Sequence, residues 1–515
     1  MKKSIFSLIA GVLLLGLLYG CSEQSDQASG EIKVGVILGF TGPIESLTPT
    51  MASSAELAMK EASDSGALLG GATVTSARAD STCVDSAAAT SAAERLVTSD
   101  KVAAIMGADC SGVTTAIANN VAVPNGVTMI SPSATSPALT TIEDKGFFFR
   151  TAPSDARQGQ VLAQVVMDRG IDKVAVTYTN NDYGKGLSNS FVGAFKSLGG
   201  TVTIEIPHED GKGDYSAEVG TLSASGAYEL VVLGYLDQGG RGIIQNSLDT
   251  GAFSRFILAD GTIGQSLIDN VDGDLTGSFG TLPGSDSEGA KIFTNIATSY
   301  GLDGSAPYAP ESYDAAALLI LAMQAGGSAD RSSIANYLMS VANAPGEKIY
   351  PGEIDLALKI LSGGGKINYE GATNVEFSDV GEAYGSYKVL EINRNQFQTA
   401  RFINEDKFLD LNISELIGTA VMNCWSIPLG IPYDENSKVS IKISFNKDGT
   451  FLNPPEILEQ ERMDKPGEEY FKVIAESALR ALRRCFPDES LDFKNYDSTQ
   501  LSNIILNFDP TEILR

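Results

Sequence analysis

Residues 31–43 read EIKVGVILGFTGP, and residues 45–66 read ESLTPTMASSAELAMKEASDSG. The first stretch is a short apolar, β-branched run that ends in a glycine-containing turn, and the second has the length and composition of a helix. Short apolar runs separated by helix-length segments are typical of parallel sheets with helical crossovers. These residues predict a strand followed by a crossover helix at the start of an α/β unit.

The same alternation continues in two series as far as residue 260. The first series goes on with the runs ATVTSARAD, VAAIM and GVTMIS, and the second, after Asp155, contains KVAVTY, TVTIEI, LVVLGY and RFILAD. We predict an α/β fold with two doubly wound parallel-sheet lobes joined by a hinge, followed by a small α+β domain. Ligands bind at the carboxyl ends of the strands in such sheets.

Composition excludes several function classes. The net charge of −27 argues against nucleic-acid binding, which depends on Lys and Arg. His208 is the only histidine, and no dinucleotide or phosphate-loop glycine motif is present, so we expect no enzyme activity, no cofactor and no metal site. The serine in DCSGV is not in a nucleophile elbow.

The N-terminus has the pattern of an export signal. Lys2 and Lys3 precede an apolar run from Ile5 to Leu18, which is short for a membrane span. The sequence LYGC ending at Cys21 resembles a bacterial lipobox, which implies lipidation of Cys21 and a periplasmic protein held to a membrane by that anchor alone. Tyr19 is bulkier than the usual residue there, and an uncleaved signal anchor is the alternative.

The composition changes near residue 401. Of 53 glycines, those beyond residue 400 are Gly418, Gly430, Gly449 and Gly467. We therefore expect a signal peptide (1–20), a polar tether (21–30), a two-lobe domain (31–402), a linker (403–411) and a C-terminal domain (412–515). This change of composition has two explanations: a two-domain protein selected for two functions, or two separate genes joined into one.

The cysteines predict disulfides in an oxidising compartment. Without Cys21, four remain, and they allow three pairings. We favour Cys83–Cys110 and Cys424–Cys485, because each pair lies within one compositional segment. Zinc binding is the alternative, but no C-x-x-C motif is present.

Eight motifs together resemble the type I periplasmic binding proteins of the branched-chain amino-acid kind, which supply ABC importers. The resemblance covers about residues 31–402 and rests on VGVILGFTGP, MGADCSGVTTA, ISPSATSPALT, FFRTAPSDARQG, NNDYGKGL, LGYLDQGG, ILADGT and YAPESYDAA. It implies an amino acid bound between the lobes and delivered to importer membrane subunits after hinge closure. Pocket size is not readable, so an amide, a urea-like compound or a small carboxylate stays open.

An amino acid needs donors for its carboxylate and acceptors for its ammonium. The resemblance places Ser111 and Thr135 as donors, and the Ser133 carbonyl and Asp260 as acceptors. Ala134 belongs to the same loop, and Tyr183 and Tyr235 would close over the ligand. Glu311 and Tyr313 are weaker candidates, since APESYDA also reads as a helix start. Each residue has a structural alternative: a helix cap for Ser111, turns for Thr135 and Asp260, and surface packing for the tyrosines.

The last hundred residues resemble another family, the C-terminal domain of TolA from the Tol–Pal envelope system. The resemblance covers about residues 412–513 and rests on VMNCWSIPLG, KVSIKISFNKDGTF, YFKVIAESALRALRRCFP and LNFDP. It implies an envelope-interaction module with Tol-system partners. The membrane helix and long spacer of TolA are absent, so an unrelated extension is the alternative. The second reading of the whole chain is an envelope structural protein whose binding unit senses a ligand or acts as a spacer.

Overall fold

The computed structural model describes residues 30–404, 417, 421, 425, 428, 437–465, 468–486, 501–502, 504–508 and 510. The expected signal peptide, Cys21 and Cys424 lie outside the described residues. The chain divides into two compact units, which are described separately. The larger comprises Met1–Gly280, Asp286–Ala383 and Glu391–Phe397, and the smaller comprises Thr281–Ser285, Tyr384–Leu390 and Gln398–Arg515.

The first lobe is built on a five-stranded parallel sheet with the order β2-β1-β3-β4-β5. Its strands are β1 (Glu31–Leu38), β2 (Thr73–Asp80), β3 (Ala104–Gly107), β4 (Met129–Ser131) and β5 (Phe148–Arg150). β1 lies between β2 and β3, with Val34 paired to Ala104, and its apolar side chains are buried. The strand order reverses between β1 and β3, so a crevice opens at their carboxyl ends.

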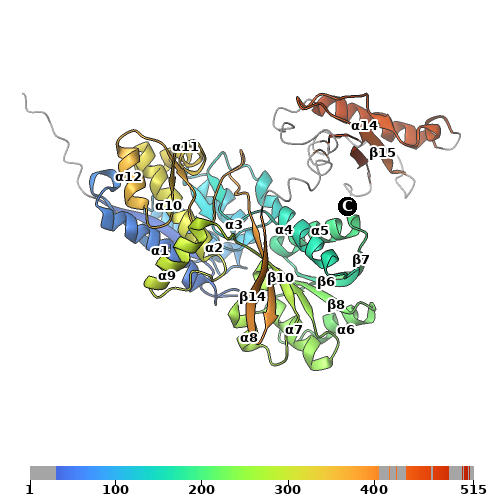
Figure 1. Cartoon of the computed structure of the whole chain (residues 1–515), viewed down its shortest axis with the longest axis horizontal. Helices are drawn as coiled ribbons and strands as arrows, with labels where there is room; N and C mark the ends of the chain where they lie inside the picture. Colours follow the sequence, from blue (N-terminus) through green and yellow to red (C-terminus); the bar gives the residue numbers. More distant parts are fainter. Residues whose placement is uncertain are drawn as a thin grey trace, which may run out of the picture. The chain divides into compact units, whose positions relative to one another are not determined.

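Helices pack against this sheet, as crossovers between parallel strands require, and Figure 1 labels the helices α1, α2, α3 and α9–α12 of this lobe. α1 packs against α10, and α10 also packs on α11, α12, β3 and β4. The helices of this lobe are α1 (Thr48–Ser65), α2 (Ser86–Thr98), α3 (Ser111–Ile117), α9 (Glu288–Ser299), α10 (Ala309–Gly326), α11 (Arg331–Ala342) and α12 (Ile354–Ser362), with a small parallel pair β11 (Glu347–Ile349) and β12 (Ile367–Tyr369).

The second lobe repeats the pattern. In its sheet, of order β14-β13-β10-β9-β8-β6-β7, the run from β10 to β7 is parallel. Its strands are β6 (Lys173–Thr179), β7 (Thr201–His208), β8 (Glu229–Leu233), β9 (Phe256–Leu258), β10 (Phe279–Pro283), β13 (Tyr387–Asn393) and β14 (Gln396–Ile403), and its helices are α4 (Asp155–Asp168), α5 (Asp182–Ser197), α6 (Ser216–Ala224), α7 (Gly239–Thr250) and α8 (Gln265–Asn270). Its order reverses between β6 and β8. The two-lobed α/β prediction is confirmed.

The smaller unit contains a short antiparallel sheet, of order β16-β15-β17, and one long helix. These elements are β15 (Val439–Ile443), β16 (Glu456–Ile457), β17 (Ile504–Phe508) and α14 (Glu469–Cys485). Trp425 packs edge-on against Phe508 at 5.1 Å, and its Nε1–H donates to Ser477 Oγ at 2.6 Å. A small α+β domain is therefore present, as the sequence predicted. β14 runs to Ile403, the first residue of the expected linker.

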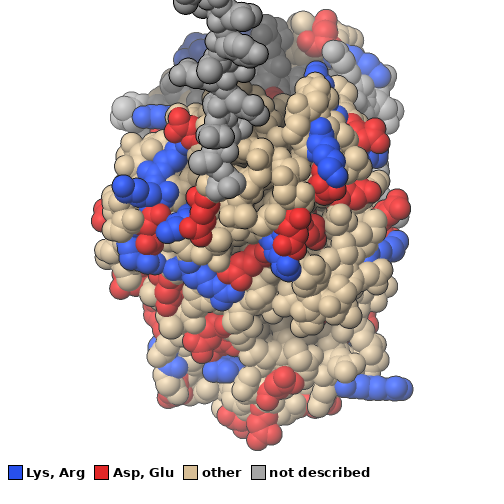
Figure 2. Space-filling view, turned by 90° about the vertical axis from the view of Figure 1, so that its left-hand side faces the viewer, with Lys and Arg blue, Asp and Glu red and all other residues tan. Residues whose placement is uncertain are grey.

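On the face drawn in Figure 2, acidic and basic side chains are interspersed, so the negative net charge is not gathered into one patch there. None of the helices that the structure describes is long and apolar enough to cross a membrane. Within the same residues, no group of His, Cys, Asp and Glu is arranged to hold a metal ion.

Candidate binding site

A pocket lies between the two lobes, at the ends of the strands where both sheet orders reverse. It encloses about 320 Å³ of space outside the protein atoms, part of it open to solvent. The first lobe contributes Ile44, Leu47, Asp109, Cys110, Ser111, Ser133 and Tyr308, and the second contributes Tyr183, Tyr235, Asp260 and Gly261. Residues of both lobes therefore line one site, as is common for small-ligand sites between domains.

Asp260 is the central carboxylate of the pocket. It follows β9 and is 3% exposed. Its Oδ1 accepts a hydrogen bond of 2.9 Å from the phenol of Tyr183, and its Oδ2 accepts one of 2.5 Å from the phenol of Tyr308. Burial raises the pKa of Asp260, and these two phenols oppose the rise. Asp260 is therefore a buried acceptor between neutral donors.

Two tyrosines of the second lobe form an aromatic wall. The rings of Tyr183 and Tyr235 stack at 5.2 Å with planes 19° apart, and both side chains are buried. The Tyr183 oxygen also accepts the Gly261 N–H at 3.1 Å. Burial raises the pKa of both phenols well above the usual value, so they stay neutral. They are not surface-packing residues.

Ser111 and Ser133 line the opposite side. The Ser136 N–H donates to Ser111 Oγ at 3.1 Å, which leaves the Ser111 hydroxyl hydrogen to donate elsewhere. Ser111 is the first residue of α3, and no side chain caps that helix. Ser133 Oγ donates to the Asp109 carbonyl at 3.1 Å. The cap alternative for Ser111 is therefore not what the structure shows.

The pocket-lining residues do not include Ala134, Thr135, Glu311 or Tyr313. The Thr135 hydroxyl is buried, makes no regular hydrogen bond among the described residues and lies near the carboxyl group of Asp155. The Tyr313 hydroxyl donates to Glu61 Oε2 at 2.7 Å, between α10 and α1. The Glu311 carbonyl accepts from the Thr151 hydroxyl at 2.9 Å. The weaker candidates Glu311 and Tyr313 lie in the first turns of α10, where they contact neighbouring elements of the first lobe and do not line the pocket.

Sequence reasoning missed Asp109 and Tyr308. Asp109 follows β3, and its carboxylate accepts from the Gly39 N–H at 2.5 Å, the Ser81 hydroxyl at 2.9 Å and the Cys110 N–H at 3.0 Å. It therefore ties together the ends of β1, β2 and β3. The signal for Asp109 was its position directly after a strand in MGADCSG. Tyr308 is the first residue of the motif YAPESYDAA, in which Glu311 and Tyr313 were named as candidates and Tyr308 was not.

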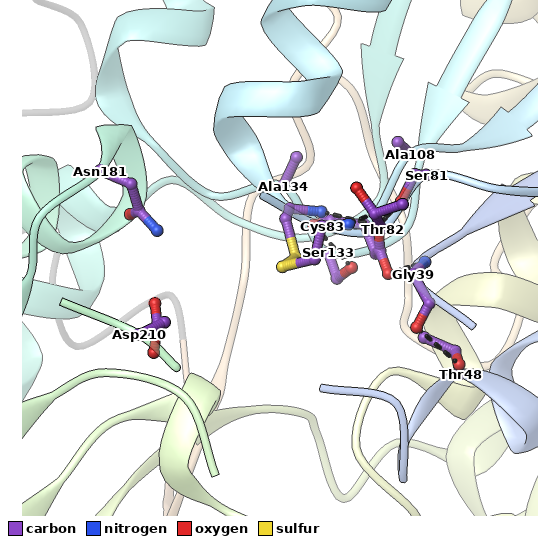
Figure 3. Close-up of a disulfide and its surroundings, with 12 residues drawn as sticks. Gly39, Thr48, Ser81, Thr82, Cys83, Ala108, Ser133, Ala134, Asn181 and Asp210 are labelled. Atoms are coloured by element: carbon purple, nitrogen blue, oxygen red, sulfur yellow. Dashed lines mark hydrogen bonds between the residues drawn. A yellow bond between two sulfur atoms is a disulfide. The ribbon is translucent and has the colours of Figure 1, made fainter. Parts of the chain in front are cut away.

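The Cys83–Cys110 disulfide is formed beside the pocket, with its Cα atoms 5.1 Å apart. It joins the loop after β2 to the N-terminus of α3. Figure 3 shows Ser133 near it, whereas Asn181 and Asp210 of the second lobe face it from across the site. Cys485 is also disulfide-bonded, with a partner outside the described residues. Zinc is excluded for Cys83 and Cys110, because both sulfur atoms are committed to the disulfide.

Buried Arg150 supports the loop that carries Ser133. Its Nη1 donates to the carbonyls of Ala134 and Ser136 at 3.1 and 2.9 Å, and its Nη2 pairs with Glu382 at 2.5 Å. Arg150 ends β5, where the chain leaves the first lobe, and Glu382 lies where it crosses again. The Arg150 guanidinium therefore connects the loop that carries Ser133 to two segments that pass between the lobes, the end of β5 and the region of Glu382.

Sequence comparison agrees with this geometry. Residues 31–351 match the family described as periplasmic binding protein, and the chain belongs to this family of non-enzymatic solute-binding proteins. Residues 410–493 match a family of uncharacterised conserved proteins.

Individual relatives are similar over most of their length. The Leu/Ile/Val-binding protein homolog 1 of Brucella melitensis is 30% identical over 343 residues, 65% of this chain and 87% of that protein. The chemotactic substrate-binding protein BasB of Halobacterium salinarum is 24% identical and covers 74% and 92%. The crystal structure of the leucine-binding protein LivK from Thermotoga maritima superposes with a TM-score of 0.61 at 26% identity, over 73% of this chain and 99% of that one.

Proposed function

We propose that the chain is a lipid-anchored receptor that binds an amino acid of the branched-chain type between its lobes and delivers it to an ABC importer. The observation that carries this proposal is Asp260, a buried carboxylate in a pocket lined by both lobes. A buried charge requires a charged or hydrogen-bonding partner, and a ligand ammonium supplies both.

The two ends of the pocket fit the two charges of an amino acid. In our proposal the ammonium binds Asp260 and the Ser133 carbonyl. The carboxylate accepts from the Ser111 hydroxyl, with Thr135 as a further donor once the ligand is bound. None of the described residues that line the pocket is an arginine or a lysine, so hydroxyl and amide hydrogens are the donors that they offer.

The aliphatic side chain would lie against the apolar wall. Ile44 and Leu47, from the loop before α1, line the pocket opposite the stacked Tyr183 and Tyr235. Such a wall stabilises a branched aliphatic group by about 25 cal/mol per Å² buried. This arrangement favours leucine, isoleucine or valine over polar amino acids.

The test is a thermal-shift screen of the chain from Ser22 onward against the twenty amino acids, small amides and small carboxylates. A ligand at 100 times its Kd stabilises by about 2.7 kcal/mol. We expect a branched-chain amino acid to raise Tm, and Asp260→Ala to abolish the shift. A ligand that still binds Asp260→Ala keeps the receptor and overturns the ammonium assignment. A folded chain without any ligand overturns the receptor proposal.

The second candidate function concerns the C-terminal domain. We propose that it is a TolA-like envelope-interaction module that binds Tol-system proteins, and that Cys21 carries the lipid. Support comes from the compact fold, in which α14 covers a small antiparallel sheet and Trp425 and Phe508 pack in the core. Pull-down of Tol components by the full chain without any amino acid would favour an envelope role. Failure to bind them, with leucine binding intact, would reject it.

A further inference from the structure

Asp155 is a buried carboxyl group that has no hydrogen-bond partner among the described residues. It is the first residue of α4 and is fully buried, and neither Oδ1 nor Oδ2 accepts a hydrogen bond. Its own N–H donates to the Thr135 carbonyl at 2.8 Å, and the Thr135 hydroxyl lies near enough to its carboxyl group to favour the ionised form without forming a regular hydrogen bond. An ionised carboxylate in such a position is costly, because little replaces its hydration.

A second carboxylate is close by. Gln158, one turn further along α4, hydrogen-bonds Asp260, and Asp155 feels the charge of Asp260 directly. Asp155 does not line the pocket, whereas Asp260 does. Asp155 therefore acts on the pocket through its charge interaction with Asp260. Two like charges in a buried site cannot both ionise at little cost.

The other charged or titratable groups around the pair do not neutralise it. Tyr183 from α5 and Tyr308 before α10 both donate to Asp260 and remain neutral. Arg150 from β5 attracts Asp155, but its guanidinium is hydrogen-bonded to two carbonyls, Thr140 and Glu382. Glu311 is an acidic residue in the first turn of α10, and its main-chain carbonyl accepts from the Thr151 hydroxyl.

We propose that one of the two carboxyl groups of Asp155 and Asp260 is protonated in the ligand-free cleft, so that the pair holds one proton, and that the ammonium of a bound amino acid displaces this proton to solvent. The step balances simply: the ammonium keeps its own protons, one carboxyl O–H bond breaks, and one proton goes to the buffer. One positive charge, the proton, leaves the pair and another, the ligand ammonium, takes its place. This inference rests on the proposed function.

Burial and mutual repulsion act in the same direction on the two groups. Burial, followed by the charge of Asp260, raises the pKa of Asp155 well above its usual value, and burial raises that of Asp260. The ligand ammonium favours the ionised pair and lowers its pKa. By linkage, ligand affinity is full above the pKa of the ligand-free pair and is lost as the pH falls through it.

The experiment is calorimetric titration of the chain from Ser22 onward with L-leucine. Parallel titrations in phosphate and Tris at one pH give the number of protons released per ligand, and the series is repeated from about pH 5 to pH 8. We expect release to reach about one proton, and Kd to rise by up to about tenfold per pH unit on the acidic side. Asp155→Asn should remove both effects, and Asp168→Asn, an exposed site on the same helix, should retain them.

Each outcome decides between the proposals. Leucine binding without proton exchange at any pH overturns the shared proton and leaves the receptor standing. Persistent proton release in Asp155→Asn also overturns it. If no amino acid binds, the receptor proposal falls and this inference with it. A ligand-free check is the infrared band of a protonated carboxyl at neutral pH, which Asp155→Asn should lose; if that variant does not fold, the wild-type proton count decides.

Discussion

The phenol of Tyr308 donates a hydrogen bond to Asp260 from the opposite lobe. Tyr308 immediately precedes α10, which packs on α1 and on the first sheet, whereas Asp260 follows β9 of the second sheet. Tyr308 has a φ of +61°, a left-handed conformation that is unusual for an aromatic residue. The hydrogen bond from Tyr308 therefore joins the two lobes through Asp260, the carboxylate to which we assign the ligand ammonium.

Removing this hydroxyl should weaken ligand binding. In Tyr308→Phe, Asp260 loses one donor and the closed form loses one interlobe bond. Hydrogen bonds to charged groups contribute about 1.5–3 kcal/mol, so we expect the Kd for L-leucine to rise roughly tenfold or more. Calorimetry measures it, with Tyr300→Phe, a half-exposed tyrosine elsewhere, as control. An unchanged Kd would mean that the bond is absent from the ligand complex.

Asp237 forms a second interlobe contact at the mouth of the cleft. Its Oδ2 accepts the Ser46 N–H at 2.9 Å, its Oδ1 accepts the Ser266 hydroxyl at 2.8 Å, and its N–H donates to the Pro43 carbonyl at 3.0 Å. Asp237→Ala keeps the backbone bond and removes the bond from Ser46.

We expect Asp237→Ala to release leucine several-fold faster, because an exposed hydrogen bond contributes about 0.5–1.5 kcal/mol and here only the closed form has it. Stopped-flow dissociation measures this rate. Asp249→Ala, at an exposed position in α7, should leave it unchanged. Equal rates in the two variants would show that Asp237 does not stabilise the closed cleft.

His208 should make stability depend on pH. Burial lowers its pKa from 6.5 to about 4, and its Nδ1 lies 2.9 Å from Thr177 Oγ1. The unfolded chain therefore binds the proton more readily between these values. Stability is full above about pH 6.5 and falls by up to about 3 kcal/mol as the pH decreases to about 4.

Denaturant unfolding at pH 7 and pH 4.5 measures this loss. His208→Gln, in the only histidine of the chain, should lose clearly less stability between the two pH values than the unaltered protein does. The carboxyl groups titrate in both proteins, so the difference between them isolates the histidine. An identical loss in both would contradict the assignment.

The Cys83–Cys110 disulfide should affect both stability and binding. In the chain-entropy model a bridge across 27 residues contributes about 3–4 kcal/mol. Replacing both cysteines by serine should lower Tm and weaken leucine binding, since Cys110 lines the pocket beside Ser111. The double variant is preferable to reduction, which would also open the disulfide of Cys485. Normal affinity at a lowered Tm would limit the bridge to a structural role.

The alternation of strands and helices and five of the pocket-lining residues could be predicted from the sequence. Runs such as KVGVIL and KVAVTY, each followed by a helix, predict parallel strands because only a crossover helix joins such strands efficiently. The motifs also place Ser111, Ser133, Tyr183, Tyr235 and Asp260 at strand or helix ends, and the structure brings all five into one pocket. Local order along the chain is enough for such residues, since each follows its own strand.

The contacts among those residues depend on the folded chain and could not be predicted from local sequence. Tyr308 lies 48 residues after Asp260 and contacts it because the chain has by then returned to the first lobe. Asp155, at the start of α4, is close enough to the same carboxylate to feel its charge. Conversely, the position of Tyr313 in α10 directs its hydroxyl to Glu61, and Tyr313 does not line the pocket. Hydrogen bonds, burial and charge repulsion depend on distances in space, and residues far apart in sequence acquire those distances only when the lobes fold and close.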